Sequence, residues 1–295
     1  ASLFSIKVVA DEGMWLPQLL QVMNESDMQA KGLKLTAKDL YDVNNSSLKD
    51  AIVSLAGGGC TAEMISPEGL MLTNHHCAFR SIQEHSSITN DYLQDGFWAM
   101  SREDELQNEG LTASFLISID EVTERVLAEL NDDMSEKERR AKIREISKMI
   151  IDETTEGTHY NAKVKSFFGG NDFYILTYET FKDVRLVGAP PSSIGAFGGD
   201  TDNWMWPRHT GDFALYRIYC APDGTPAKYS LENVAYKPKH HLPIQLDGVE
   251  NGDYTMIFGY PGSTDRYLTS FGVQQALDIT NPTIVDIRDE KLAIM

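Results

Sequence analysis

Helical spacing of apolar residues marks three parts of the chain. Residues 14–23 and 36–43 are predicted to form short helices, with Thr36 as the N-cap of the second. A longer helical excursion of one or two helices is predicted at residues 118–156, with a break at 131–137. Its apolar positions are Ile119, Val122, Val126, Leu130, Ile143, Ile146 and Ile150. The charged residues between them are expected to form a solvated face.

Short apolar runs bounded by turn residues dominate the rest of the chain, and this pattern is typical of β-strands. Strands are predicted at 51–56, 60–65, 70–74, 173–178, 184–190, 213–219 and 254–260. The tight-turn sequence "SPEG" at 66–69 joins two of them, so residues 60–74 are predicted to form a β-hairpin. Many short strands interrupted by one helical segment, without an internal repeat, favour β-barrels over a parallel sheet.

The two ends of the chain each suggest processing or truncation. Residues 1–10 resemble the tail of an export signal or a tag and are excluded from the fold prediction, with an ordinary first strand as the alternative. Helical spacing is still running at 281–295, without a glycine or proline to end it. We therefore expect a truncated chain.

Composition and charge restrict the function. Of the 295 residues, 42% are hydrophobic and 9% aromatic, so the chain can bury a sizeable core. It carries 26 basic and 44 acidic residues, and the net charge of −18 argues against nucleic acid as a partner. No apolar run approaches the roughly 20 residues that span a bilayer. Of three cysteines, Cys220 is left unpaired and is expected to be buried and inert.

The candidate chemistry begins in "GGGCTAEMISPEGLMLTNHHC" at 57–77, where two histidines directly precede a cysteine. Zinc ligands usually have wider spacing, and adjacent histidines on an extended chain would point in opposite directions. His240 and His241 have the same defect, so no metal site is predicted. A redox Cys-x-x-Cys motif is also absent from the sequence. A buried structural histidine with two free thiols stays open as the alternative to a hydrolytic site.

A hairpin that begins with cysteine and is followed by His-Cys resembles the layout of chymotrypsin-like serine peptidases. "LTNHHC" at 72–77 is similar to the "TAAHC" of that clan, and the match falls on His76, not His75. The resemblance implies that His76 is the general base and that Cys77 bonds back to Cys60. A cross-linked hairpin is a rigid mount for an imidazole that must keep one orientation. His75 is expected to have a structural role.

The same resemblance extends to an aspartate and stops before a nucleophile. "TGDFALYRIY" at 210–219 is similar to the "DIALL" strand start of the clan and places its aspartate on Asp212. The serine needs a Gly-x-Ser-Gly-like turn, whose backbone N–H groups form an oxyanion hole. Ser263 follows Gly262 but lacks the second glycine. We therefore expect the serine to lie beyond Met295.

Three further stretches resemble a narrower family. They are "DEGMWLPQ" at 11–18, "APPSSIGAFGGDTDNWMWPRHTGDF" at 189–213 and "GYPGSTDRYLTS" at 259–270. Together they are similar to the bacterial dipeptidyl peptidases 7 and 11 of serine peptidase family 46. The resemblance runs along the chain from Asp11 and covers less than half of a typical member.

The family resemblance implies a mainly β fold with helical insertions, namely a chymotrypsin-like double β-barrel with a large α-helical domain inserted between its halves. Residues 11–275 would form the N-terminal part of the peptidase domain, and 276–295 would begin the helical domain. The implied activity is a serine-type dipeptidyl peptidase that releases dipeptides from the free N-terminus of peptides, without a cofactor. Members are homodimers in the periplasm or at the surface of Gram-negative bacteria.

The resemblance also assigns the residues that hold the substrate's α-amino group to Asn203 and Trp204. A buried ammonium needs acceptors or an aromatic face, and an amide oxygen and an indole supply them. Asp200 and Asp202 are candidates for adding negative potential at the same place. From composition alone, a core aromatic cluster would be the simpler interpretation of this stretch.

Two other functions stay open. One is a catalytically inactive, peptide-binding relative, which the codons after Met295 would test. The other is a metal- or redox-binding module on the His-Cys cluster, which a Cys60–Cys77 disulfide without metal would eliminate. The residues of this chain do not show whether a hydrophobic or an acidic residue is preferred at the penultimate position of the substrate. If the serine is missing, the 295-residue chain alone should be inactive.

Overall fold

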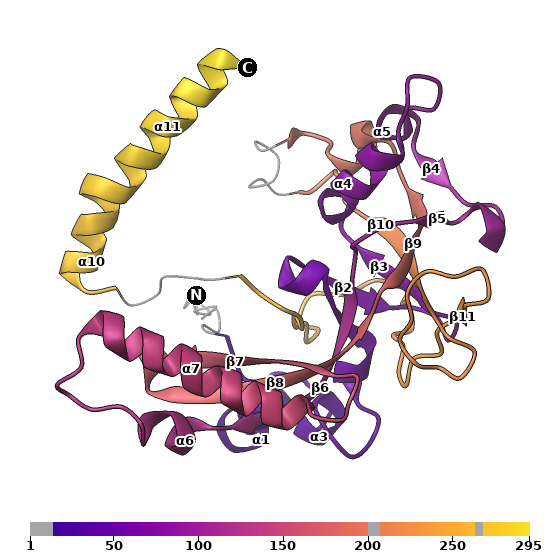
Figure 1. Ribbon diagram of the computed structural model, residues 1–295. Coiled ribbons are helices and arrows are strands. Elements are labelled where there is room, and N and C mark those ends of the chain that lie inside the picture. The colour runs from indigo at the N-terminus through magenta and orange to yellow at the C-terminus, as the bar shows by residue number, and fades with distance from the viewer. Residues whose placement is uncertain (1–13, 200–206, 263–267) are drawn as a thin grey trace, which may run out of the picture. The chain divides into compact units, whose positions relative to one another are not determined.

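The computed structural model describes residues 14–199, 207–262 and 268–295 (Figure 1). They belong to two units, Ala1–Tyr260 and Pro261–Met295. In the second unit, α10 (Ser270–Gln275) continues through one π-turn at Ala276–Thr280 into α11 (Asn281–Ile294). The helical spacing predicted at 281–295 is thus confirmed.

The described strands of the first unit form one sheet in which neighbouring strands are antiparallel. Its order is β4 (Phe97–Trp98), β9 (Asp183–Ala189), β10 (Ala214–Cys220), β3 (Leu70–Thr73), β2 (Cys60–Met64), β1 (Ile52–Leu55), β6 (Ala113–Glu121), β8 (Asp172–Phe181) and β7 (Asn161–Phe167). Two short strands extend it, β5 (Leu106–Gln107) on β9 and β11 (Val234–Ala235) on β10. The expected mainly β, non-parallel architecture is confirmed.

Helices connect and cover these strands. They are α1 (Leu20–Met23), α2 (Glu25–Ala30), α3 (Ala37–Leu40), α4 (His75–His85), α5 (Tyr92–Asp95), α6 (Thr123–Leu127), α7 (Glu136–Thr155) and α8 (Ser192–Gly195). Thr36 caps α3 as predicted, since its Oγ1 accepts a hydrogen bond from the backbone of Asp39. None of the helices in the described part of the chain is long and apolar enough to cross a bilayer.

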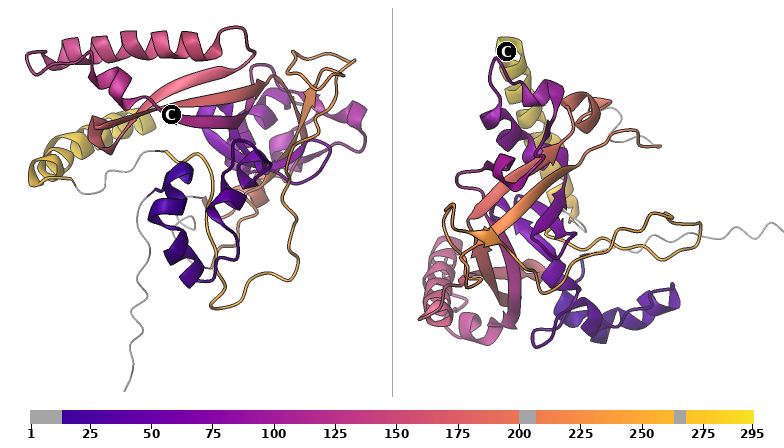
Figure 2. Two further views of the ribbon diagram at one scale, coloured as in Figure 1. Left: turned by 90° about the horizontal axis from the view of Figure 1, so that it is seen from below. Right: turned by 90° about the vertical axis from the view of Figure 1, so that its right-hand side faces the viewer.

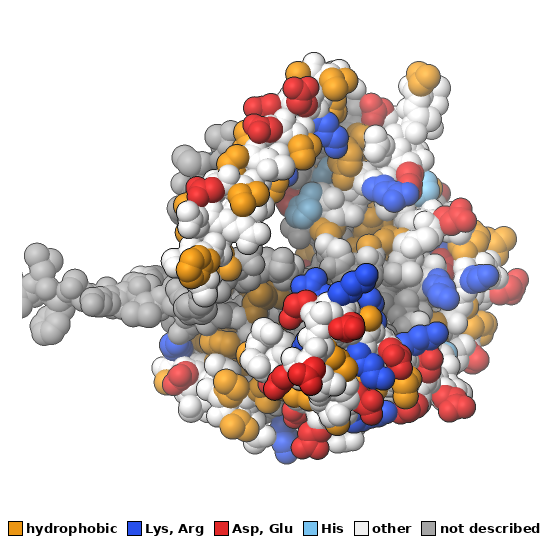
Figure 3. Space-filling model, turned by 60° about the vertical axis from the view of Figure 1, so that its left-hand side comes forward, with side chains coloured by type: hydrophobic (Ala, Val, Ile, Leu, Met, Phe, Trp, Pro, Cys, Tyr) orange, Lys and Arg blue, Asp and Glu red, His pale blue; other side chains and the backbone are white. Residues whose placement is uncertain are grey.

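The long helix α7 packs along β7 and β8, as Figures 1 and 2 show. Its start is set by a capping box in which Ser135 and Glu138 satisfy each other's backbone N–H groups. Ile146 and Ile150 of α7 are buried with Val122 and Val126, as the apolar spacing predicted. The charged side chains between these apolar positions are largely exposed. Figure 3 shows acidic and basic groups intermixed on this side of the molecule.

Two predictions about secondary structure were wrong. Ile119 belongs to strand β6, and the first helix of the excursion begins at Thr123, because β6 continues its pairing with β8 to Glu121. Residues 254–260 contain no strand, although their apolar pattern is typical of one. A strand needs a partner in a hydrogen-bonded ladder, and here the Tyr260 N–H donates to the side chain of Thr61 instead.

The main core is built on β1, β2, β3, β9 and β10. Phe115, Phe181 and Tyr236 pack as a ring cluster in it, with centroids 4.4 to 5.8 Å apart. Cys220 is buried at the end of β10 as predicted, and burial raises the pKa of its thiol. This core fixes β3 and β10, the two strands that carry the site.

Candidate active site

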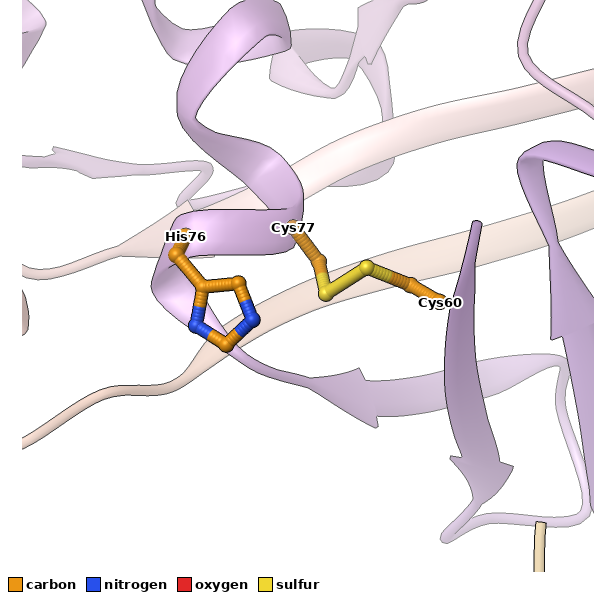
Figure 4. A group of neighbouring side chains, drawn as sticks. All are labelled: Cys60, His76 and Cys77. Carbon is orange, nitrogen blue, oxygen red and sulfur yellow. A yellow bond between two sulfur atoms is a disulfide. The ribbon is translucent and has the colours of Figure 1, made fainter. Parts of the chain in front are cut away.

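The predicted hairpin forms from β2 and β3 and is held to α4 by a disulfide. Ser66 Oγ accepts hydrogen bonds from the N–H groups of Glu68 and Leu70 at 3.2 Å each, which closes the turn. Cys60 at the start of β2 is bonded to Cys77 in the first turn of α4, with their Cα atoms 6.1 Å apart (Figure 4). Both the hairpin and the disulfide are therefore confirmed.

The two adjacent histidines lie on a helix, not on an extended chain as assumed from the sequence. Because α4 begins at His75, successive side chains diverge by about 100° around its axis. His75 is 1% exposed, whereas the side chain of His76 is 70% exposed. Only His76 of this pair is therefore open to a ligand.

The His-Cys cluster brings ligand atoms of His76, Cys60 and Cys77 within 4.8 Å of one another. Figure 4 shows the imidazole beside the bonded sulfur atoms. Cysteine binds zinc as a thiolate, and each of these sulfur atoms is instead committed to the disulfide. As long as the disulfide is intact, the cluster does not have the donor set of a zinc site.

Asp212 meets His76 because β3 and β10 are neighbours. Ala214 lies opposite Thr73, so the residues after β3 stand beside the residues before β10. Asp212 Oδ2 is 2.7 Å from His76 Nδ1, and Asp212 Oδ1 accepts the His76 backbone N–H at 3.0 Å. The structure thus brings together the two residues that the sequence selected as base and aspartate.

Asn74 is a member of this group that the sequence interpretation missed. Its Nδ2 donates to Asp212 Oδ2 and to the Asp212 backbone carbonyl, at 3.2 Å each. An asparagine directly before a helix is usually interpreted as its cap, yet Asn74 makes no side-chain cap bond to α4. The only available signal was its position in "LTNHHC".

These donors keep the carboxylate of Asp212 ionised. Burial alone would raise its pKa, but hydrogen bonds from the backbone and ring of His76 outweigh burial and bring the pKa below its usual value. The Asp212 side chain is 25% exposed, so it is shielded without being sealed from water. A charged carboxylate at His76 Nδ1 favours the tautomer with hydrogen on that atom and leaves Nε2 as a base.

The predicted amine-binding residues lie outside the described residues: Asp200, Asp202, Asn203 and Trp204. The described residues on either side are tied together next to Asp212. Thr210 Oγ1 donates to the carbonyls of Ile194 and Gly195 at 3.2 Å each, and the Gly211 N–H donates to Ile194 at 3.0 Å. The roles assigned to the four residues stay predictions.

No serine hydroxyl hydrogen-bonds the His76 ring within residues 14–199, 207–262 and 268–295, where its ring partner is Asp212. Ser263 lies outside the described residues. The described part of the chain thus presents a base and its carboxylate, with the outer edge of the imidazole exposed to solvent. Such a pair can take a proton from a hydroxyl or water placed at Nε2.

Comparison with known proteins identifies the family of this chain. The family model described as Peptidase S46 matches residues 10–295. The chain belongs to peptidase family S46. This S46 chain is 53% identical over 294 residues to an Asp/Glu-specific dipeptidyl-peptidase of Flavobacterium psychrophilum, a match that covers 99% of the chain and 41% of the relative.

Other relatives of this S46 chain carry two different names. A dipeptidyl-peptidase 7 of Capnocytophaga gingivalis is 48% identical over 277 residues, covering 94% of the chain and 39% of the relative. The crystal structure of Porphyromonas endodontalis DPP11 in complex with substrate matches with a TM-score of 0.85 and 42% identity, over 95% of this chain and 41% of that one. The chain spans about two fifths of the length of these relatives.

The disulfide should contribute measurably to stability. Replacing Cys60 and Cys77 together by serine is expected to lower the free energy of unfolding by about 3 kcal/mol, because the bond closes a loop with a sequence separation of 17. Urea unfolding monitored by circular dichroism measures this difference. A reductant should bring the wild type to the level of the variant and leave the variant unchanged. Equal midpoints without reductant would contradict the prediction.

Proposed function

We propose that this chain supplies the general base of a serine exopeptidase that releases dipeptides from the free N-terminus of peptides. The observation that carries the proposal is the 2.7 Å contact between His76 Nδ1 and Asp212 Oδ2 in a member of family S46. Relatives named as dipeptidyl-peptidases, at 53% and 48% identity, support the class of reaction.

In the proposed mechanism, His76 Nδ1–H donates to Asp212, and the lone pair on Nε2 takes the proton of a serine hydroxyl as the serine oxygen bonds to the carbonyl carbon of the second peptide bond. The imidazolium that forms is stabilised by the Asp212 carboxylate, which Asn74 and the His76 N–H hold in place. The imidazolium then gives its proton to the leaving amine, and the free N-terminus of the shortened peptide departs. Water repeats the cycle on the acyl-enzyme.

Selection for a free N-terminus requires a partner for the α-ammonium group. We propose Asn203 as a hydrogen-bond acceptor and Trp204 as an aromatic wall, with Asp200 and Asp202 adding negative potential. The motif resemblance supports this assignment, as does the tie between Ile194 and Gly211, since it brings the ends of this segment next to Asp212. A Porphyromonas endodontalis DPP11 structure contains the dipeptide Arg-Glu, which supports a dipeptide-sized site in relatives.

The rest of the site would come from residues outside this chain. The relatives are matched over 41% and 39% of their length, which leaves room for a serine, an oxyanion hole and a second barrel elsewhere. We propose that the sheet described above is one part of a chymotrypsin-like double β-barrel, and that residues 276–295 begin an inserted helical domain. We assign no preferred penultimate residue, because both Asp/Glu-specific dipeptidyl-peptidases and dipeptidyl-peptidases 7 match this chain.

We propose further that the protein is exported to the periplasm or cell surface of a Gram-negative bacterium and acts as a homodimer on peptides. The Cys60–Cys77 disulfide supports export, because disulfides persist in oxidising compartments. The dimer rests on the family resemblance alone.

The proposed function is tested with the complete protein and chromogenic dipeptide substrates whose N-terminus is free or acetylated. Hydrolysis is expected for the free form, should be lost in His76→Ala, and should be much slower for the acetylated form. The isolated 295-residue chain should show none. Equal hydrolysis of both substrates would contradict the exopeptidase assignment, and activity of the isolated chain that depends on His76 would contradict an external serine.

A further inference from the structure

His75, the buried neighbour of the proposed base, packs against the short helix α8 with no room to spare. A Cβ atom added to Gly195, the last residue of α8, would overlap Cγ, Cδ2 and Nδ1 of the His75 ring. Gly195 does not have the left-handed backbone that glycine favours, so what this position requires is space and not conformational freedom. The His75 ring at the start of α4 and Gly195 of α8 are therefore in close contact, although they are far apart in the sequence.

The polar contacts of His75 indicate a neutral ring. The ring hydrogen-bonds the backbone of Pro190, which precedes α8, while its Nε2 is buried without a partner among the described residues. A protonated ring would bury an N–H group that has no acceptor. Burial also lowers the pKa of His75, although the nearby Asp212 carboxylate opposes this shift. His75 is thus unsuited to act as a second base. It can instead make a rigid packing contact with α8.

The helix α8 is also hydrogen-bonded to the residues that precede Asp212. Thr210 and Gly211 bond the carbonyls of Ile194 and Gly195 at 3.0 to 3.2 Å. Gly211 is also tight against α8, because a Cβ there would come 2.8 Å from Ile194 Cγ2. The α8 turn thus contacts both the His75 ring and the residue directly before Asp212.

We propose that His75 is a positioning residue that acts through α8 to hold Asp212 at hydrogen-bond distance from His76. The inference rests on the proposed function, because it assigns His75 a part in the same reaction. If α8 shifts, the backbone of Thr210 and Gly211 shifts with it, and the carboxylate leaves the place where Asn74 and His76 bind it.

Displacement of Asp212 should change the pH dependence of kcat/KM. The titratable groups that act on His75 are Asp212 and His76, and those that contact Asp212 are the two histidines. A carboxylate that moves away stabilises the His76 imidazolium less, both in the free enzyme and during the reaction. The acid limb of kcat/KM should therefore move to lower pH while kcat decreases. The same tie also supports the segment proposed to bind the α-ammonium group, so KM should rise, but by a smaller factor than kcat falls.

The test uses the complete protein with four changes: Gly195→Ala, His75→Asn, His75→Ala and the double variant His75→Ala/Gly195→Ala. In Gly195→Ala we expect kcat to fall by about tenfold to a hundredfold, as small misplacements in active sites do, with the acid limb shifted to lower pH. His75→Asn keeps an amide donor near the position of Nδ1 and should retain most activity. In the double variant the methyl group added to Gly195 has the space that the His75 ring leaves, so its loss of activity should be smaller than the product of the single losses.

His85→Ala is the matched control on the same helix. His85 contacts Asn108 Oδ1 at 3.2 Å, far along α4 from the site, so its loss should change thermal stability more than kcat or the pH profile. A folded Gly195→Ala protein with unchanged kcat and acid limb would overturn the inference, as would single losses that multiply in the double variant. If His75→Ala does not fold, Gly195→Ala and His75→Asn decide the test. Activity that survives His76→Ala would instead contradict the proposed function.

Discussion

Asp212→Asn should lower kcat of the complete enzyme by about 10⁴-fold, the effect known for the aspartate of serine peptidase triads. The Asp212 carboxylate accepts bonds from the His76 ring, the His76 N–H and Asn74. An asparagine has one oxygen and one NH₂ group, so one of these donors must face another donor. If the NH₂ group faces Nδ1, the imidazole takes the tautomer with hydrogen on Nε2 and cannot accept the serine proton.

The pH dependence separates Asp212 from His76. Because the folded pKa of Asp212 is depressed, its pairing stabilises the protein above the unfolded pKa of about 3.9, and this contribution is lost as pH falls through the folded value. Protonation of Asp212 therefore does not account for a loss of wild-type activity at higher pH. Urea unfolding between about pH 2 and 6 measures the loss of stability, and steady-state kinetics across about pH 4–9 measures activity.

Asp223→Asn is the matched control. Asp223 is an exposed aspartate in the turn after β10, where it accepts bonds from Thr225, so its replacement should leave kcat and the pH profile unchanged. A kcat for Asp212→Asn within tenfold of wild type would contradict the proposed role of the pair.

Asp183→Ala should cost about 3–5 kcal/mol of stability, because it leaves a buried guanidinium without its counter-charge. Asp183 is 0% exposed and binds Arg185 through two hydrogen bonds of 2.9 and 2.8 Å. Asn233 adds a third at 2.9 Å, and the guanidinium lies 3.7 Å from the ring centroid of Tyr219. This network joins β9, β10 and the loop before β11, so we expect poor folding or a much lower urea midpoint.

An exposed ion pair gives the contrast. Glu84→Ala removes the partner of Arg80, whose side chain is 87% exposed, and should hardly change the urea midpoint because water screens exposed ion pairs. The double change Asp183→Leu/Arg185→Met removes both buried charges and should be less destabilising than Asp183→Ala alone. Similar urea midpoints for Asp183→Ala and Glu84→Ala would contradict the assigned role of the buried pair.

Local signals predicted those elements whose causes lie within a few residues. The "SPEG" turn closes through the Ser66 hydroxyl, and Thr36 caps its helix through a residue three positions away. The apolar spacing of Ile146 and Ile150 likewise identified the buried face of α7. In each case the bonding groups are close in sequence, so little chain has to be ordered to bring them together.

The same reasoning failed where a partner far along the chain decided the outcome. Ile119 has helical spacing with Val122, but pairing of β6 with β8 makes it part of a strand. Residues 254–260 form a short apolar run like a strand, yet no ladder forms there among the described residues. Asn74 looks like a helix cap, and its partner Asp212 is 138 positions away. Periodicity and capping preference carry no information about such partners.

The sequence by itself determined the hairpin and, through motif resemblance, the cysteine pair and which histidine and which aspartate belong together. Only the tertiary structure decided their surroundings: His75 is buried against Gly195, and His76 is left 70% exposed beside Asp212. Both histidines have the same side chain and adjacent positions, so nothing local distinguishes their environments. The difference arises because β10 and α8 pack onto the start of α4 from more than a hundred residues away, and that packing is a non-local property of the folded chain.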